Sequence, residues 1–179
     1  MKYYCVMVKT REEEKFKRLL ERRLSLAGKD DLEVIFFKKK LPHKKSNKDY
    51  ETPLFKSYVF IATNELDLGS IWIIKRTEYF LRFLNSNRDI KPLKGQDLEY
   101  VEKLLKFGKT QGLSKAYFDE NMRIVITEGP LMGFSGKIYK VNRRQQRVTI
   151  LLEMFHNTIK CDLGYELIKP ETEQDKKAT

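Results

Sequence analysis

Few residues in this chain have the types and spacing that enzymatic or metal chemistry requires. The two cysteines, Cys5 and Cys161, lie far apart, and neither has a second Cys or His at ligand spacing. We therefore expect buried reduced thiols, with neither a zinc site nor a disulfide framework. The two histidines, His43 and His156, are equally isolated, so the sequence offers no pairing of a nucleophile with a base. These observations predict a protein that is not an enzyme and that binds no metal and no cofactor.

Two other patterns that suggest catalysis also fail on inspection. The dense acidic runs Glu12–Glu14 and Asp30–Asp31 fall in the first turn of one predicted helix and near a helix end. Acids in a first turn suit the helix dipole and do not by themselves form a metal site. The glycine-rich stretch 129–137 ends in Gly-Lys, but Leu131 stands where a phosphate loop has its first glycine and Ile138 replaces the required hydroxyl. The sequence therefore does not predict nucleotide binding here.

The chemistry that the sequence does favour is the binding of polyanions. The chain of 179 residues carries 36 Lys and Arg against 25 Asp and Glu, a net charge of +11, and its pI is about 9.5. Residues 1–107 hold 24 basic and 16 acidic side chains, whereas residues 108–179 hold 12 and 9. The stretch Lys38–Lys48 contains six lysines and no acid. The N-terminal part is thus the better candidate for contacting nucleic acid, although solubility alone also explains a basic surface, and a lysine-rich loop can simply be a solvated hairpin.

The hydropathy of the chain predicts a cytoplasmic protein without membrane contact. The start, Met1–Tyr4, opens no apolar run of the length a signal peptide needs, and no segment approaches eighteen apolar residues. The 41% hydrophobic content is sufficient for ordered cores. We expect a monomer.

The elements that position these residues divide into two parts. The periodicity of residues 1–107 predicts an α+β sandwich in which one antiparallel sheet carries helices on one face. Strands are expected at 3–9, 32–37, 55–62 and 79–84, and helices at 11–27, 66–74 and 92–107. For the first helix, Thr10–Glu13 predicts a capping box at the start and Gly28 a stop at the end.

The C-terminal part has the pattern of a small closed barrel. Short strands are expected at 122–127, from the turn at 129–136 to residue 142, and at 147–153, 158–163 and 166–169. Five short strands with tight turns suit a barrel better than an open sheet. The small polar residues of 108–118 predict a linker before it, and the polar residues 171–179 predict a flexible tail.

Certain residues of this barrel resemble a known motif. Gly129, Phe134, Gly136 and Ile138 are placed as in the KOW motif of transcription and ribosomal proteins. Together with Lys2–Val6, Leu54–Phe60 and the helix around Trp72, the order of motifs resembles the NusG family over nearly the whole chain. The resemblance implies an NGN domain at 1–107, a linker at 108–118 and a KOW domain, a barrel of the Src-homology-3-like type, at 119–170.

The resemblance implies a function in transcription. In the NusG family the NGN domain binds RNA polymerase at the clamp helices near the upstream DNA and suppresses pausing, and the KOW domain recruits partners. Leu54–Tyr58 departs from the family's usual aromatic-aromatic-Pro-Gly-Tyr, which favours a specialised role over a housekeeping one. The basic NGN domain is most similar to the LoaP-type paralogs, which are processive antiterminators that read an RNA hairpin in the nascent transcript. The alternatives are a general NusG-type elongation factor without RNA specificity and a ribosome-associated KOW RNA-binding protein.

The residues suggest where polymerase would bind. The strand Phe55–Ala62 is apolar on both faces, so the face away from the helices needs a cover. We predict that Tyr3, Phe55 and Tyr58 form a hydrophobic anchor for polymerase at the positions where the resemblance places that contact. The alternative is that Tyr3 and Phe55 are ordinary core residues.

The remaining site predictions concern RNA and the KOW partner. The RNA-binding candidates are the cations of the lysine-rich stretch and of the region around the last strand: Lys38, Lys39, Lys40, Lys44, Lys45, Lys48, Arg76, Arg82 and Arg88. The lysines could equally contact DNA upstream of the polymerase. In the turn Met154–Asn157, Phe155 is the predicted exposed aromatic that recruits a ribosomal protein or a termination factor, as the resemblance implies. The alternative is a phenylalanine buried in the barrel.

Overall fold

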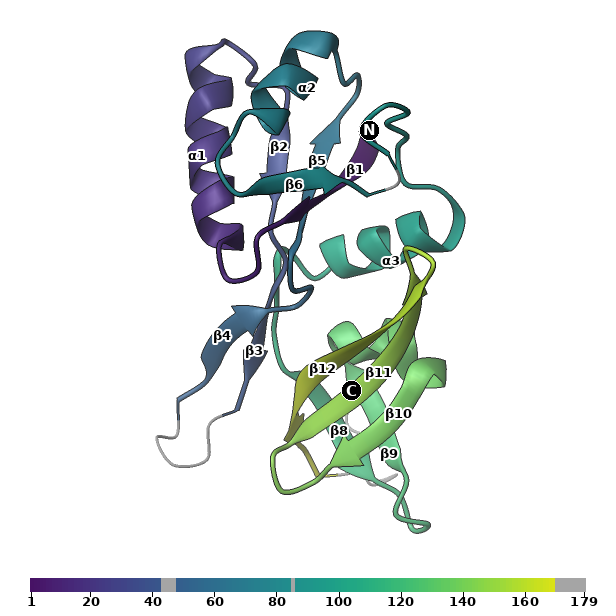
Figure 1. The fold of residues 1–179 in the computed structure, drawn as a ribbon. Helices are drawn as coiled ribbons and strands as arrows, with labels where there is room; N and C mark the ends of the chain where they lie inside the picture. Colours follow the sequence, from purple (N-terminus) through teal and green to yellow (C-terminus); the bar gives the residue numbers. More distant parts are fainter. Residues whose placement is uncertain (43–47, 85, 170–179) are drawn as a thin grey trace, which may run out of the picture.

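The computed structural model describes residues 1–42, 48–84 and 86–169, with an α/β part and a smaller β part (Figure 1). The N-terminal sheet is antiparallel throughout and has the strand order β2-β5-β1-β6. Its strands are β1 (Lys2–Val8), β2 (Glu33–Ile35), β5 (Tyr58–Thr63) and β6 (Phe80–Phe83). β1 lies one residue earlier than the strand predicted at 3–9, and the strand predicted at 55–62 begins three residues later than expected.

Two helices, α1 (Glu13–Leu26) and α2 (Leu68–Lys75), cover one face of this sheet. Phe16, Leu20 and Leu24 recur every four residues along α1 and are buried against Val59 and Ile61 of β5. Residues four apart share one face of a helix, so this stripe faces the sheet. The result is a core made only of N-terminal residues.

The start of α1 differs from the predicted capping box. The helix begins at Glu13, and its N-cap residue Glu12 makes no side-chain capping bond. The Thr10 hydroxyl bonds the Ser57 hydroxyl at 2.7 Å, and the Glu13 carboxylate accepts the Ser57 backbone N–H at 2.7 Å. The capping box is wrong because both of its side chains are used across the fold. The predicted glycine stop is confirmed, because Gly28 lies two residues after Leu26, the last residue of α1, and has φ +66°.

Part of the lysine-rich stretch is a strand. β3 (Lys38–Leu41) pairs with β4 (Tyr50–Pro53) as a hairpin and, in parallel, with the short β7 (Thr110–Gln111). This hairpin extends beyond the N-terminal sheet and lies beside the C-terminal strands (Figure 1). The prediction of a loop from residue 38 is therefore wrong for Lys38–Leu41.

The C-terminal part is a five-stranded barrel of the KOW type, with the order β10-β11-β12-β8-β9. Its strands are β8 (Ser114–Phe118), β9 (Ile124–Glu128), β10 (Ile138–Asn142), β11 (Arg147–Met154) and β12 (Asn157–Leu167), and the 3-10 helix η1 (Pro130–Lys137) joins β9 to β10. The first of these strands comes from the predicted linker, and the two strands predicted at 158–163 and 166–169 are the single strand β12. Gly129 has φ +93°, and a Cβ there would lie 2.8 Å from Ser114 Cα, so the turn into η1 requires glycine.

The third helix, α3 (Gly95–Leu105), lies on the other face of the N-terminal sheet, next to the barrel. The expectation that all helices share one face is thus wrong. α3 packs on β11 and η1, with the Tyr100 and Phe134 rings 5.7 Å apart. A second core therefore runs without interruption from the sheet through α3 into the barrel.

Candidate functional site

The uncovered face predicted for β5 is covered by the barrel of the same chain. The Phe155 ring lies 5.0 Å from the Tyr58 ring and 6.2 Å from the Phe60 ring, measured between centroids. Phe155 occupies the tight turn between β11 and β12 with φ +57° and is 4% exposed. The exposure predicted for Phe155 is therefore wrong, because the second apolar face of the sheet provides its surroundings.

The three residues predicted to anchor polymerase come together in this shared core. Phe55 is 1% exposed and packs edge-on against the Phe37 and Phe60 rings at 6.1 and 5.9 Å. Tyr3 and Tyr58 are partly buried against the same cluster. The three side chains thus occupy one face of the sheet, and the barrel packs over part of that face.

A polar contact accompanies the aromatic one. The backbone N–H of Phe155 donates to both carboxylate oxygens of Asp97 on α3, at 3.3 and 3.4 Å. The side-chain amide of Asn157 donates to the Phe155 carbonyl at 3.0 Å. Burial raises the pKa of the Asp97 carboxyl, while the Phe155 N–H opposes the rise. The turn that carries Phe155 is therefore held on two sides, by α3 and by its own strand.

The segment Leu54–Tyr58 reaches its conformation without the glycine that the resemblance to the NusG family leads one to expect. Ser57 stands at that position with φ +67°, which is unfavourable for a residue with a side chain. Its N–H donates to Glu13, which is 2% exposed, and its carbonyl accepts the Val8 N–H at 2.9 Å. These bonds from α1 and β1 hold the turn that places Phe55 and Tyr58.

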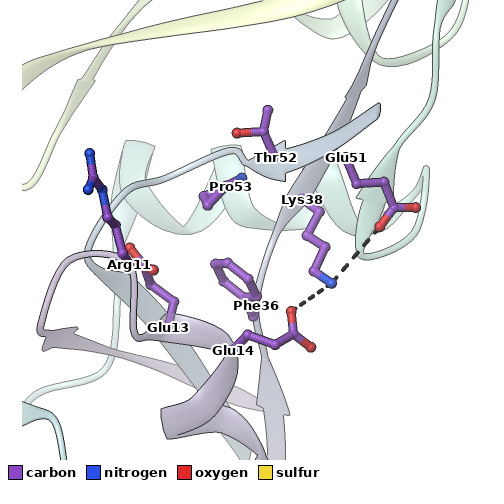
Figure 2. A pocket seen from close by; sticks show the side chains of 8 residues that line it. All are labelled: Arg11, Glu13, Glu14, Phe36, Lys38, Glu51, Thr52 and Pro53. Atoms are coloured by element: carbon purple, nitrogen blue, oxygen red, sulfur yellow. Dashed lines mark ion pairs between the residues drawn. The ribbon is translucent and has the colours of Figure 1, made fainter. Parts of the chain in front are cut away.

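The lysines predicted to bind RNA are in different environments. Lys38 lines a hollow of about 330 Å³ between the start of α1 and the hairpin, with its ammonium 2.6 Å from Glu14 and 3.9 Å from Glu51 (Figure 2). Lys39 is 9% exposed, and Lys40 and Lys48 are exposed. The candidates Lys44 and Lys45 lie outside the described residues. Because Lys38 already has two carboxylates, it is less available to a phosphate than Lys40 or Lys48.

The predicted arginines do not join the hairpin lysines. Arg76 ends α2, and its guanidinium lies 4.8 Å from the centre of the Trp72 ring. Arg82 lies on the edge strand β6 and donates to the Leu84 carbonyl at 2.8 Å, and Arg88 is exposed beyond it. The hairpin and α2 lie at opposite ends of the N-terminal sheet (Figure 1).

The structure adds residues to Arg76 that sequence reasoning missed. Arg23 of α1 donates to the Arg76 carbonyl at 2.6 Å. Two hollows of about 310 and 430 Å³ lie along this side of α1, the first lined by Arg23 and Trp72 and the second by Arg18 and Arg22. Trp72 is 59% exposed. The signal in the sequence is the basic polar face of the first helix, but nothing in the pattern shows that Trp72 lies exposed beside it.

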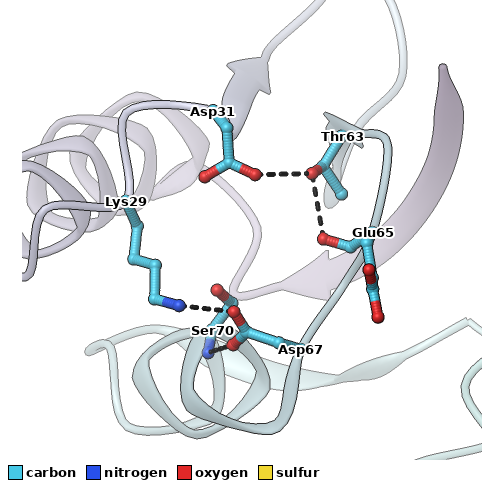
Figure 3. A network of polar contacts seen from close by, with 6 residues as sticks. All are labelled: Lys29, Asp31, Thr63, Glu65, Asp67 and Ser70. Carbon is cyan, nitrogen blue, oxygen red and sulfur yellow. Dashed lines mark hydrogen bonds and ion pairs between the residues drawn. The ribbon is translucent and has the colours of Figure 1, made fainter.

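Near the carboxyl end of α1, acids serve structural roles (Figure 3). Asp67 caps α2 by accepting the Ser70 N–H at 2.7 Å and pairs with the Lys29 ammonium, which lowers the Asp67 pKa to about 2. The Thr63 hydroxyl lies 3.3 Å from the Asp31 carboxylate and 3.0 Å from the Glu65 carbonyl. Within residues 1–42, 48–84 and 86–169, no three His, Cys, Asp or Glu side chains are grouped so that they could hold a metal ion. None of the helices in these ranges has the length and apolar character that crossing a membrane requires.

Comparisons with known proteins agree with this architecture. A family profile described as "Transcription termination factor nusG" matches residues 1–102. The transcription termination/antitermination protein NusG of Rickettsia bellii (strain RML369-C) is 22% identical over 172 residues, covering 94% of this chain and 89% of the relative. The protein of the same name from Rickettsia felis (strain ATCC VR-1525 / URRWXCal2) is 20% identical over 158 residues, covering 88% and 81%.

A solved structure shows the same fold. It is described as "Domain interaction in Thermotoga maritima NusG", is 20% identical in sequence, and superposes with a TM-score of 0.58 over 91% of this chain and 93% of that one. The family profile covers more than half of the present chain. By its sequence and its fold, this chain belongs to the NusG family of transcription factors.

Proposed function

We propose that this chain is a processive transcription antiterminator that binds RNA polymerase through the sheet face carrying Tyr3, Phe55 and Tyr58, and binds nascent RNA through its basic N-terminal part. Family membership supports the general role, since the curated relatives are named termination/antitermination proteins. The sites are inferred from this chain's own residues. We place the NGN domain at 1–107 and the KOW domain after it, with the hairpin and α3 in contact with both.

The observation that carries the polymerase proposal is the occupied face of β5. An apolar sheet face that a tight turn of another module covers is a surface suited to docking a protein. Tyr58 and Phe60 hold one phenylalanine of the barrel there. A polymerase helix that binds the same face must displace Phe155, so barrel and polymerase compete for Tyr58.

Competition also supports the role proposed for the barrel. Phe155 is 4% exposed while the barrel lies on the sheet. Once displaced, the β11–β12 turn becomes available for a ribosomal protein or a termination factor. Polymerase docking and recruitment through Phe155 then occur in the same separated arrangement.

RNA binding is supported by charge and by position. Lys40 and Lys48 on the hairpin are exposed, and Arg76 stacks on the exposed Trp72, so cations and an aromatic ring are accessible while the barrel is packed. If about six phosphates are neutralised, the affinity falls with salt with a log-log slope of roughly four to six. A hairpin reader retains a preference for a GC-rich RNA hairpin over unpaired RNA and a DNA duplex at physiological salt, whereas a general elongation factor does not.

The polymerase proposal is tested by titrating the full chain and its variants with RNA polymerase. Phe155→Ala removes the barrel's anchor without altering the proposed polymerase contacts, so we expect it to tighten binding. Tyr58→Ala alone loosens the barrel and also removes a polymerase contact, so its effect is ambiguous. In the Phe155→Ala background, however, Tyr58→Ala affects only polymerase and should weaken binding about tenfold or more.

Tyr139→Ala is the matched control, because Tyr139 is an aromatic side chain on the barrel with 61% exposure. It should leave polymerase affinity unchanged. Equal polymerase affinity of Phe155→Ala with and without Tyr58→Ala would exclude this face as the docking site. The proposal would also fail if Phe155→Ala weakened binding while Tyr139→Ala did not.

A further inference from the structure

The β3–β4 hairpin and the barrel meet along a close seam, which we define as the contact of β3 with β12 and of β4 with Arg147 of β11. A Cβ at Gly164 of β12 would lie 2.9 Å from Pro42 Cδ and 3.0 Å from the Lys40 carbonyl oxygen, so the strand and the hairpin touch through their backbones. Arg147 of β11 is the register partner of Gly164. Its guanidinium donates to the Tyr50 hydroxyl of the hairpin at 2.8 Å. Only glycine allows this approach, and Arg147 crosses the seam beside it.

Two cationic side chains, those of Lys39 and Arg147, lie at the seam. Lys39 lies there with 9% exposure, and among the residues that the structure describes its ammonium makes neither a hydrogen bond nor an ion pair but keeps a small contact with solvent. The Arg147 Nε is buried, and it too lacks a partner within that part of the chain. Burial lowers the pKa of the Lys39 ammonium; Cys161 and Asp162 oppose this shift, and Lys56 and Arg147 add smaller contributions in the same direction as burial. Asp162 itself is hydrogen-bonded to the Thr149 hydroxyl at 2.6 Å.

An arrangement of this kind stabilises an anion more than it stabilises the empty protein. A buried cation without a partner is unfavourable for folding, and a neighbouring cation increases that cost. An anion with several acceptor oxygens reverses the balance, because an ammonium and a guanidinium each form charge-assisted hydrogen bonds with it. The planar fork of arginine matches a phosphate in particular.

We propose that this seam binds a phosphate of a nucleic-acid backbone, with Lys39 from the hairpin and Arg147 from the barrel contacting one phosphodiester group. The inference rests on the proposed function for the class of ligand, since Lys39 is one of its RNA-binding candidates. It adds a second residue, Arg147, from the other half of the chain. It also makes this contact dependent on the packing of the two halves.

The position of the site has a consequence for regulation. Because Lys39 and Arg147 belong to the two sides of the seam, a bound strand holds hairpin and barrel together. Polymerase docking on the β5 face instead requires the barrel to leave. By thermodynamic linkage, nucleic acid in the seam weakens polymerase binding, and polymerase weakens nucleic-acid binding in the seam by the same factor. The exposed Lys40, Lys48 and Arg76 lie outside this pair and remain available to RNA when polymerase has docked.

The test measures the affinity of the full chain for unpaired RNA, a DNA strand of equal sequence and a GC-rich RNA hairpin by fluorescence anisotropy at physiological salt. Lys39→Gln and Arg147→Gln should each weaken backbone binding about tenfold. The double variant should be little weaker than either single one, because both residues contact one phosphate. Lys40→Gln is the matched control, since it removes the same charge from the adjacent, exposed position of β3, and it should weaken binding about twofold to threefold.

Thermal unfolding separates loss of the site from loss of the fold. Lys39→Met keeps an apolar stem at this position. Without nucleic acid, the melting temperatures of Lys39→Gln and Lys39→Met should be equal to or higher than that of the parent chain, because an unpaired, largely buried charge has been removed. The rise in melting temperature that nucleic acid gives the parent should be smaller in both variants. A loss of stability in both variants without nucleic acid would contradict the proposed strain and overturn the site.

The outcomes distinguish this site from the proposed function. If Lys39→Gln and Lys40→Gln weaken binding equally while the parent still prefers the RNA hairpin, the seam site is refuted and the RNA function stands. If the parent chain binds all three nucleic acids with equal affinity, but Lys39→Gln and Arg147→Gln still weaken binding more than Lys40→Gln does, the seam site stands and the proposed RNA-specific function fails. Equal results for RNA and DNA strands in the seam assign the contact to the backbone phosphate, and absence of binding by the parent chain refutes both.

Discussion

Truncating Phe155 tests the packing of the barrel against the N-terminal sheet most directly. Phe155 is 4% exposed and contacts the Tyr58 and Phe60 rings at 5.0 and 6.2 Å. Replacing a buried phenylalanine by alanine costs about 3–5 kcal/mol. Because these rings belong to the other half of the chain, we assign most of this loss to the contact between the halves. A loss of about 3 kcal/mol changes the ratio of packed to separated molecules roughly a hundredfold.

Hydrogen exchange reports this ratio at a defined atom. The backbone N–H at position 155 donates to Asp97 on α3, so it exchanges when the turn leaves the helix. We expect Phe155→Ala to lower its protection roughly a hundredfold in the full chain. Amides of β1 should keep their protection, because the core between α1, α2 and the sheet contains no barrel residue. Tyr139→Ala is the control and should leave protection at position 155 unchanged, since its ring is 61% exposed.

Two results would refute the reasoning. Unchanged protection at position 155 would mean that the ring contributes nothing to holding the barrel on the sheet. A parallel loss of protection in β1 would mean that the two halves unfold as one unit and that the covered face is ordinary core. Loss confined to the β11–β12 turn and α3 is the result expected for a separable contact.

The remaining predictions concern the turn at Ser57 and the start of α2. Glu13→Ala should lower the free energy of unfolding by about 1.5–3 kcal/mol by removing the charge-assisted bond to the Ser57 N–H, and Ser57→Gly should restore part of it because glycine tolerates φ +67°. Urea unfolding measures the free energy of unfolding of these variants. Glu14 is an exposed neighbouring acid, so Glu14→Ala should have little effect. An equal loss of stability in Glu13→Ala and Glu14→Ala would contradict the role of Glu13. For Asp67, pairing with Lys29 lowers the pKa from 3.8 to about 2, so the ionised carboxylate stabilises the fold above pH 4 and that contribution disappears as the pH falls toward 2. Melting curves of the parent and Asp67→Asn should therefore differ by a few degrees at pH 7 and converge near pH 2, and a difference independent of pH would show that the charge of Asp67 is not involved.

The elements that local pattern determines were predictable from the sequence. The four-residue recurrence of Phe16, Leu20 and Leu24 gave α1 its place and its buried face. The strand β8 was not predictable in this way, because its pairing with β12 joins residues about fifty positions apart. Polar residues before it, such as Thr110 and Gln111, look like a linker until β3 supplies them with a partner. Long-range pairing decides these segments, and a local window does not contain it.

The candidate site was likewise predictable where local pattern or composition determines it, and not where tertiary contacts do. The two apolar faces of β5 indicated that a cover was needed, but nothing in the pattern named Phe155 of the same chain as that cover. Composition located the lysine-rich stretch, yet it could not show that Glu14 and Glu51 pair with Lys38 or that Lys39 is buried. Charge counts give the total available for a polyanion, and tertiary contacts decide which charges remain available.

The helix α3 determines how much must change when the barrel leaves the sheet. Its side chains face the barrel, where Tyr100 packs on Phe134 and Asp97 accepts the Phe155 N–H. On the sheet side, Val101 and Leu104 of α3 belong to the same core as Cys5 and Phe60, and the segment before the helix donates the Leu93 N–H to the Tyr3 carbonyl at 2.7 Å. If α3 stays with the sheet during separation, it loses its cover over Tyr100, whereas if it moves with the barrel, it loses its packing in the core shared with the sheet and the connection before it has to change. Gly95, with φ +55° and space around it at the first residue of α3, allows that change. The Phe155 N–H leaves Asp97 only if α3 stays with the sheet, so loss of protection at position 155 identifies that arrangement.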